Sequence, residues 1–348
     1  MNFDFKSISS NRSAPVYLIA EVGVNHNGNL GLAKSMVRSA AECGAHAVKF
    51  QTFTAEGLVT RGTPKVEYQK STTSDQESHY EMIKNLEMPE SFYPELIELC
   101  NELKVDFLST PYDVQSVDFL ESLNVGLYKA ASADLVDHIL LERIAKTLKP
   151  TILSTGMATL GEIEEALEIF HKQGNEQVIL LHCVSNYPCS ISSLNLLSMQ
   201  TLSHAFGFPV GYSDHSEGSL AASISVALGA VLVEKHFTTD KTLAGPDQAA
   251  SSSPEEFREL VSQVRLAQSA LGSPVKACQE EERQMSFVSR KSLVTSRELS
   301  ADSIIQREDL TVKRPGTGLR SKVMSEVIGR RVRRDLPVNH LLDWGDFQ

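Results

Sequence analysis

Short apolar runs recur along this chain, and each is followed by an amphipathic stretch. The runs are rich in Val, Ile and Leu without strict alternation, as expected of strands that are buried on both faces. They are eight in number and cover 16–23, 46–53, 105–111, 126–132, 150–156, 177–184, 208–215 and 230–237. The stretches between them, such as LGEIEEALEIFHKQG, repeat apolar residues at helical spacing, and some end in Gly, a common helix stop.

Eight β–α units in one chain predict a closed (β/α)₈ barrel, the TIM barrel. An open, doubly wound sheet is the alternative, but no G-x-G-x-x-G turn follows the first apolar run. The chain has 348 residues, which fits a barrel of about 250 residues together with a smaller domain.

Two segments depart from the repeating pattern. Residues 54–88 form an insertion rich in Thr, Ser, Lys, Glu and Tyr, which is either a lid over the site or a surface excursion. Near the C-terminus, the β-like pieces KSLVTS, DLTVKR and RRVRRDL alternate with turns and charges. We therefore expect a barrel domain over 1–275, a linker over 276–287 and a small β-rich domain over 288–348.

The composition narrows the choice of partners and compartment. Hydrophobic residues make up 41% and charged residues 22%, as is ordinary for a globular protein. A net charge of −11 argues against nucleic acid or an anionic membrane as the partner, and an anionic substrate then needs a locally basic site. Five irregularly spaced cysteines predict free thiols. Since neither a signal peptide nor a membrane span is recognisable, we expect a cytoplasmic protein.

Two lysines are candidates for an anion site. Lys49 and Lys129 each lie inside an apolar run, where burying an ammonium group is costly without a partner. The carboxyl ends of barrel strands meet at one mouth, where hydroxyl residues such as Ser154 and Thr110 also fall. Two cations among hydroxyls suit a phosphate and a carboxylate. Structural ion pairs and a Schiff-base lysine, as in an aldolase or lyase, are the alternatives.

A histidine pair and a glutamate complete the candidate chemistry. His215 and His236 end the seventh and eighth runs, which are neighbours in a barrel, so their imidazoles suit a divalent metal ion. Water and substrate would complete the coordination sphere. Glu21, at the end of the first run, is a candidate for proton transfer or the counter-ion of a lysine.

Taken together, these motifs resemble the sialic acid synthase family over nearly the whole chain. The matching motifs, in order, are EVGVNHNG, AVKFQTF, FLSTPYD, YKAASAD, ILSTGMA, LLHCVSNYP, GYSDHS, EKHFT and GPD. The segment PKVEYQK (64–70) looks like bacterial members, and SRKSLV…LTVKRPGTGL is similar to the family's C-terminal antifreeze-protein-like (SAF) domain. The family includes synthases for N-acetylneuraminic, legionaminic and pseudaminic acids.

The resemblance implies a reaction, a set of residue roles and an assembly. Phosphoenolpyruvate would condense with an open-chain N-acylated amino-sugar aldehyde and release phosphate by C–O cleavage, in a domain-swapped homodimer. Glu21 would act on the attacking water or the tetrahedral intermediate. The residues that would hold phosphoenolpyruvate are Lys49, Thr110, Lys129, Ser132, Ser154 and Ser213. Tyr187, Asp247 and the partner subunit's Arg314 would contact the sugar, and Asp134 would also bind substrate. His215 and His236 would hold Mn²⁺, or else Mg²⁺ or Co²⁺.

Two positions depart from the family pattern, and the choice of sugar stays open. Gln248 stands where the family usually has His, and Ala133 where it usually has Gly. We favour N-acetylmannosamine, which gives N-acetylneuraminate, over 2,4-diacetamido-2,4,6-trideoxymannose, which gives legionaminate. A Schiff-base aldolase or lyase and a non-catalytic sugar-binding protein are the alternatives from other classes.

Overall fold

The computed structural model describes residues 3–10, 14–65, 73 and 77–348. Most of the PKVEYQK motif therefore lies outside the described residues. The chain divides into two compact units, Met1–Gly272 and Ser273–Gln348. Among the described residues, no helix combines the length and apolar character needed to cross a membrane.

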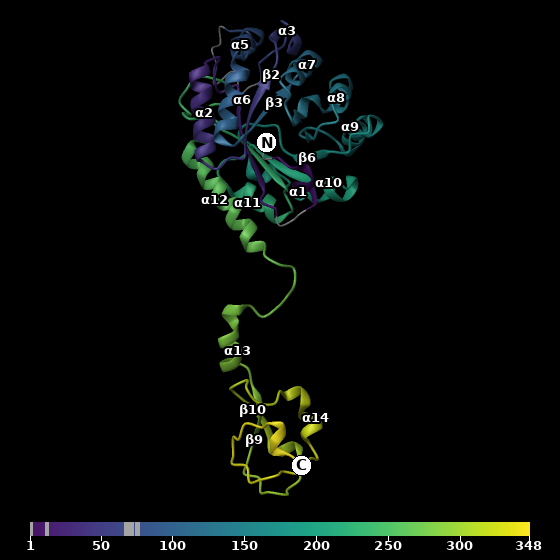
Figure 1. Ribbon diagram of the computed structural model, residues 1–348, viewed down its shortest axis with the longest axis vertical. Coiled ribbons are helices and arrows are strands. Elements are labelled where there is room, and N and C mark those ends of the chain that lie inside the picture. The colour runs from purple at the N-terminus through teal and green to yellow at the C-terminus, as the bar shows by residue number, and fades with distance from the viewer. Residues whose placement is uncertain (1–2, 11–13, 66–72, 74–76) are drawn as a thin grey trace. The chain divides into compact units, whose positions relative to one another are not determined.

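The first unit is the expected barrel of eight parallel strands (Figure 1). In chain order the strands are β1 (Tyr17–Gly23), β2 (Ala47–Thr52), β3 (Asp106–Pro111), β4 (Tyr128–Ala130), β5 (Thr151–Ser154), β6 (Val178–His182), β7 (Val210–Asp214) and β8 (Leu232–His236). The hydrogen-bonded order is β3-β2-β1-β8-β7-β6-β5-β4, and the end strands β3 and β4 also lie against each other. All eight apolar runs contain a strand, so the prediction of a (β/α)₈ barrel is confirmed.

Helices follow the strands and cover the outside of the barrel (Figure 1). They are α2 (Leu30–Glu42), α6 (Phe92–Leu103), α7 (Val114–Ser122), α8 (His138–Ala145), α9 (Leu160–Lys172), α10 (Ser198–Phe206), α11 (Leu220–Ala227) and α12 (Pro254–Leu271). Side chains fix several of their first turns: Thr159 and Ser253 each accept a hydrogen bond from the backbone of a Glu three residues on, and that Glu bonds back.

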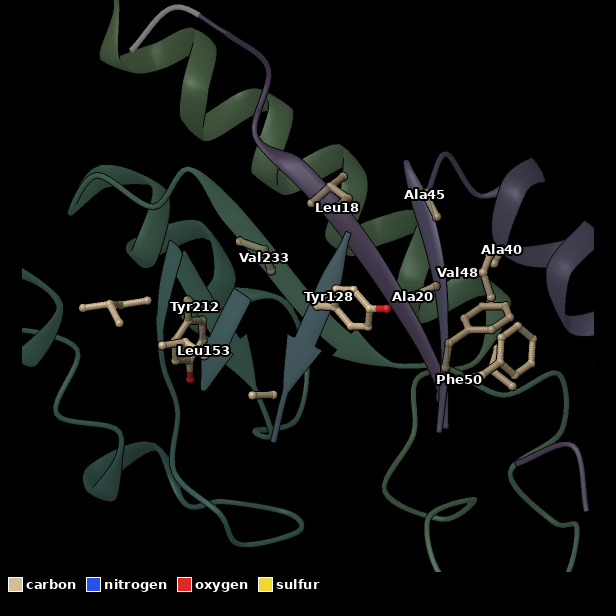
Figure 2. Close-up of a cluster of buried hydrophobic side chains, with 14 of the residues drawn as sticks. Leu18, Ala20, Ala40, Ala45, Val48, Phe50, Tyr128, Leu153, Tyr212 and Val233 are labelled. Carbon is tan, nitrogen blue, oxygen red and sulfur yellow. The ribbon is translucent and has the colours of Figure 1, made fainter. Parts of the chain in front are cut away.

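Side-chain alternation along the strands separates two environments. On β1 and β2, Leu18, Ala20, Val48 and Phe50 face the helices, in the larger apolar cluster (Figure 2). Their neighbours face the barrel axis instead. The layer along the axis that lies nearer the amino ends of the strands is apolar. It contains Tyr17, Ile19, Ala47, Leu108, Leu127, Ile152, Ile179, Leu181 and Leu232. Phe3 and Ile8, from the N-terminal segment around α1 (Phe5–Ser10), join it.

The next inward positions toward the strand ends are polar. Two residues beyond Ile19 comes Glu21, and two beyond Ala47 comes Lys49. The same step leads from the apolar layer to Thr110, Lys129, Ser154 and Glu234, and Ser213 lies two residues beyond Gly211. All of these residues are buried. The barrel therefore carries an apolar floor beneath a polar layer at its carboxyl-terminal mouth.

The second unit has a core of its own. Strands β9 (Ser292–Thr295) and β10 (Leu310–Lys313) pair antiparallel over an apolar cluster that includes Leu293 and Leu310. The third expected piece, RRVRRDL, forms isolated bridges in place of a strand, with Val332 and Leu336 buried and the residues between them exposed. The expected linker, 276–287, contains a short 3₁₀ turn and most of helix α13 (Arg283–Ser289).

The described part of the insertion contributes helices α3 (Ala55–Leu58) and α5 (His79–Leu86). Met82 and Leu86 of α5 pack with Val24 and Phe53 in a small apolar cluster beside the barrel mouth. The described part of the insertion is therefore packed against the mouth rather than projecting from it.

Candidate active site

The barrel mouth contains a cavity of about 290 Å³ that gathers most of the predicted residues. The predicted residues that line it are Glu21, Lys49, Thr110, Lys129, Ser132, Ser154, Tyr187, Ser213, His215, His236 and Asp247. They come from every strand or the loop that follows it, so residues more than 200 positions apart meet here. Asp134 is not among the described residues of the lining, although Ser132 and Ala133 are.

Two lysines and two glutamates form neighbouring ion pairs at the bottom of this cavity. Lys49 Nζ lies 3.2 Å from Glu21 Oε2 and 3.2 Å from Glu234 Oε1. Lys129 Nζ lies 3.9 Å from the same Glu234 oxygen and donates to Ser154 Oγ at 2.6 Å. The sequence left a structural ion pair and an anion site as alternatives for the lysines, and the geometry permits both, since each ammonium has a carboxylate partner and still borders the cavity.

The two carboxylates differ in ionisation. Burial, opposed by Lys49, raises the pKa of Glu21 to about 7. Burial also acts on Glu234, but the attraction of Lys129 and Lys49 outweighs it and lowers that pKa below its ordinary value. Glu234 is thus a fixed anion between two cations, whereas Glu21 can exchange a proton near neutral pH.

Hydroxyl groups and a glycine shape the side of the cavity near Lys129. Ser132 Oγ accepts a hydrogen bond from the Gly156 backbone N–H at 3.0 Å and lies 3.1 Å from Cys183 Sγ. A Cβ on Gly156 would come within 2.4 Å of Ser185 Oγ and 2.8 Å of Ser132 Oγ. Only glycine lets this backbone approach the hydroxyls so closely.

The histidine pair lies at the rim, beside an aromatic ring. The ring centroids of His215 and His236 are 5.7 Å apart, and Tyr187 lies 4.2 Å from the first and 5.4 Å from the second. His215 Nδ1 bonds the Val184 carbonyl at 2.7 Å, which turns Nε2 toward Ser213, 3.3 Å away.

These histidines fit a divalent metal ion. Burial lowers the pKa of His215 to about 4, and burial with the nearby His215 lowers that of His236 well below its ordinary value, so both are neutral, the form that ligates. Among the described residues, His236 Nδ1 is buried without a hydrogen-bond partner. Among the residues that the structure describes, no group of three or more His, Cys, Asp or Glu is arranged to hold a metal.

The three other predicted residues, Asp247, Asp134 and Arg314, differ in their surroundings. Burial raises the pKa of Asp247 to about 6, and burial with the charge of Asp137 raises that of Asp134 to about 7. Arg314 belongs to the second unit, where its Nε donates to the Ser289 carbonyl at 3.1 Å.

Gln248, the departure from the family pattern, is buried and has a structural role. Its side-chain amide donates to the Asn25 carbonyl at 2.8 Å and accepts from the Thr238 hydroxyl. It thereby joins the loop after β8 to the loop after β1. It is not one of the described residues that line the cavity.

Sequence reasoning missed part of the site. Glu234 was not predicted as a partner of the two lysines, although strand alternation from His236 turns it inward. Tyr112, which comes directly after β3, lines the cavity, and so do Leu58, Ile83 and Leu86 of the insertion. Nothing in the polar composition of the insertion indicated this apolar wall.

The mouth of this eight-stranded barrel thus gathers paired lysines and carboxylates beside a histidine pair, an arrangement typical of an enzyme active site. Residues 36–276 match the NeuB family, and residues 290–348 match the SAF domain. The chain belongs to the NeuB family and is a synthase of the transferase class.

Relatives extend over almost the whole chain. The chain is 43% identical to the N,N'-diacetyllegionaminic acid synthase of Legionella pneumophila over 95% of its length and 94% of that protein. It is 41% identical to the synthase of that name from Campylobacter jejuni, over 93% of this chain and 98% of that one. The crystal structure of N-acetylneuraminic acid (sialic acid) synthetase from Leptospira borgpetersenii, in complex with citrate, matches with a TM-score of 0.69 and 36% identity, covering 78% of this chain and 90% of that one.

Proposed function

We propose that this protein condenses phosphoenolpyruvate with the open-chain aldehyde of an N-acetylated amino sugar, giving a nonulosonic acid and phosphate. The observation that supports this most strongly is the polar layer of the barrel. Lys49 and Lys129, together with the hydroxyls of Thr110, Ser132 and Ser154, border one small cavity. Two buried ammonium groups among hydroxyls match the phosphate and carboxylate of phosphoenolpyruvate.

The raised pKa of Glu21 supports its role in the proposed reaction. C3 of phosphoenolpyruvate attacks the aldehyde carbon, a C–C bond forms, the aldehyde oxygen gains a proton and C2 becomes cationic. Water then adds to C2, and Glu21 accepts the proton that the water loses. The bond between C2 and the phosphate oxygen breaks, phosphate leaves with the electron pair, and the C2 hydroxyl loses its proton to give the ketone.

We assign His215 and His236 to a divalent metal ion, with Mn²⁺ as the expected one. Such an ion would polarise the aldehyde oxygen of the sugar as a Lewis acid. The Tyr187 ring, tilted by 38° against the His215 ring with the centroids 4.2 Å apart, lines this side of the cavity. Asp247, whose pKa burial raises to about 6, faces the same cavity and is available to bond a sugar hydroxyl.

The apolar part of the cavity lining bears on the choice between the two sugars. Leu58, Ile83 and Leu86 form an apolar wall. A 6-methyl group can be buried there without loss, whereas a 6-hydroxyl would need a hydrogen-bond partner. The relatives named as diacetyllegionaminic acid synthases point the same way. We therefore favour 2,4-diacetamido-2,4,6-trideoxymannose, and N-acetylmannosamine, our choice from sequence alone, stays an untested prediction.

We further propose that the protein acts as a homodimer in which Arg314 of one subunit enters the other subunit's barrel mouth and contacts the N-acyl group. The support is the family resemblance around RPGTG and the match to the SAF domain. Light scattering that gave a monomer at working concentration would overturn this assignment.

The proposed reaction is tested with purified protein, Mn²⁺, phosphoenolpyruvate and each sugar separately, following phosphate release and product mass. In ¹⁸O-labelled water, the label should enter the nine-carbon product and not the phosphate, because the C–O bond breaks. Release with one sugar only assigns the substrate. Release with neither sugar, in folded and metal-loaded protein, overturns the proposed function.

A Schiff-base mechanism is the competing chemistry that this site allows. Burial and nearby Lys49 lower the pKa of Lys129, which is the property a Schiff-base lysine needs. Borohydride added with pyruvate would then attach a three-carbon unit to Lys129. We expect no such adduct by mass spectrometry, since Lys129 bonds Ser154 and the Ala130 carbonyl.

A further inference from the structure

The residues just before the two histidines form a second, separate buried ion pair. Asp214 precedes His215 at the end of β7, and Lys235 precedes His236 at the end of β8. The strand register places Asp214 opposite Lys235. Alternation therefore turns the histidines toward the cavity and this pair away from it, and neither Asp214 nor Lys235 is among the described residues of the lining.

The pair connects both strands to the loop that follows His215. Lys235 Nζ donates to Asp214 Oδ2 at 2.9 Å and also to the Ser216 carbonyl. Asp214 Oδ1 accepts from the Ser216 backbone N–H at 2.9 Å and from its hydroxyl at 2.7 Å. The residues on both sides of His215 are thus held by one ion pair that begins on the neighbouring strand.

The pair is buried almost completely, with side-chain exposure of 3% for Lys235 and 0% for Asp214. Buried ion pairs contribute little net stability compared with apolar residues of similar volume, so stability alone gives no reason for one here. In some proteins a buried ion pair fixes the conformation instead. Here the pair joins β7 to β8, the two strands that carry the imidazoles.

We infer that the Asp214–Lys235 ion pair is a positioning device that sets β7 against β8 so that His215 and His236 present to the same divalent ion. Neither residue touches the substrate or the metal. The inference rests on the proposed metal site, and its test must separate the two.

The test measures Mn²⁺ affinity by calorimetry, phosphoenolpyruvate affinity without metal, and the urea midpoint. Lys235→Met and Asp214→Asn should each weaken Mn²⁺ binding about tenfold and change phosphoenolpyruvate affinity less than about twofold. The double variant should bind Mn²⁺ no more weakly than either single variant, because both changes remove the same interaction.

Tyr17→Phe is the matched control. Tyr17 donates to Asp106 Oδ2 at 2.6 Å in the floor of the barrel, so this variant also disturbs a buried charged group. It should lower the urea midpoint and leave Mn²⁺ affinity unchanged. Equal loss of Mn²⁺ affinity in Tyr17→Phe and Lys235→Met would mean a general structural effect and would overturn the inference.

The remaining outcomes also decide. If the wild type binds no Mn²⁺, or binds it as well after His215→Ala, the proposed metal site fails. If the wild type binds Mn²⁺ through His215 and Lys235→Met binds it equally, the positioning inference alone fails. Should Lys235→Met not fold, Asp214→Asn removes the charge but keeps the shape of the side chain, and an unchanged Mn²⁺ affinity in that variant would overturn the inference.

Discussion

At the scale of single residues, Glu21 and Glu234 illustrate how neighbours set function. Both are buried, and both lie 3.2 Å from Lys49. Glu234 also lies 3.9 Å from Lys129, and the two cations together keep it ionised. Lys129 has only a small effect on Glu21, where burial dominates. One carboxylate therefore neutralises the lysines, and the other is available for proton transfer.

The pKa of Glu21 predicts the pH dependence of the reaction. A base must be ionised, so kcat/KM should rise as the pH increases through about 7 and then level off. Glu21→Gln should lower kcat by about 10²- to 10⁴-fold and remove this acid limb. A pH series of initial rates checks both, and an unchanged limb in the variant would assign it to another group.

Gly156 predicts a steric effect on phosphoenolpyruvate binding. In Gly156→Ala the new methyl group would displace Ser132 and Ser185, so we expect the KM for phosphoenolpyruvate to rise about tenfold. Gly161→Ala, in helix α9, is the control, because its Cβ would meet only Thr159 Oγ1 at 4.0 Å. That variant should leave the kinetics unchanged, and a KM for Gly156→Ala equal to the wild type would contradict the assignment of Ser132.

At the scale of elements, the insertion supplies an apolar wall to a site that is otherwise polar. Helices α3 and α5 reach the cavity through Leu58, Ile83 and Leu86. Buried Met82 anchors α5 to Phe53 and Val24. Of the two interpretations of the insertion, lid or surface excursion, its described part supports a role in the site.

Trimming this apolar wall should change the KM for the sugar alone. Ile83→Ala should raise the KM for the sugar about fivefold, corresponding to about 1 kcal/mol of lost apolar contact, and leave the KM for phosphoenolpyruvate unchanged. Ile97→Ala is the control and should change neither KM. Ile97 is also partly buried on a helix, but it packs against the larger apolar cluster outside the barrel. The measurement is steady-state kinetics with each substrate varied in turn. An equal rise in the KM for both substrates would contradict the prediction.

At the scale of the whole molecule, the chain consists of two compact units with separate apolar cores. Glu21 lies in the first unit and Arg314 in the second. A site shared between subunits therefore predicts complementation between variants that are each inactive.

Mixing Glu21→Gln with Arg314→Ala should restore about a quarter of wild-type activity. Random pairing makes half of the dimers mixed, and each mixed dimer has one intact site of two. The measurement is the initial rate after co-refolding of equal amounts. If the mixture stays as inactive as the separate variants, the cross-subunit role of Arg314 is wrong.

The sequence by itself determined the barrel and most of the residues that meet at its mouth. Eight apolar runs specified the strands, and the side-chain period of two then placed Glu21, Lys49, Lys129 and Ser154 in one inward layer, because that period is a local property of an extended chain. The order of the motifs along the chain, from EVGVNHNG to GPD, indicated the family.

Only the tertiary structure decided how those residues act. The contrast between Glu21 and Glu234, the apolar wall carrying Ile83, and the Asp214–Lys235 pair all depend on which distant segments meet and how deeply they are buried. Ionisation and cavity shape follow from burial and from distances between charges, and these quantities exist only once the barrel has closed.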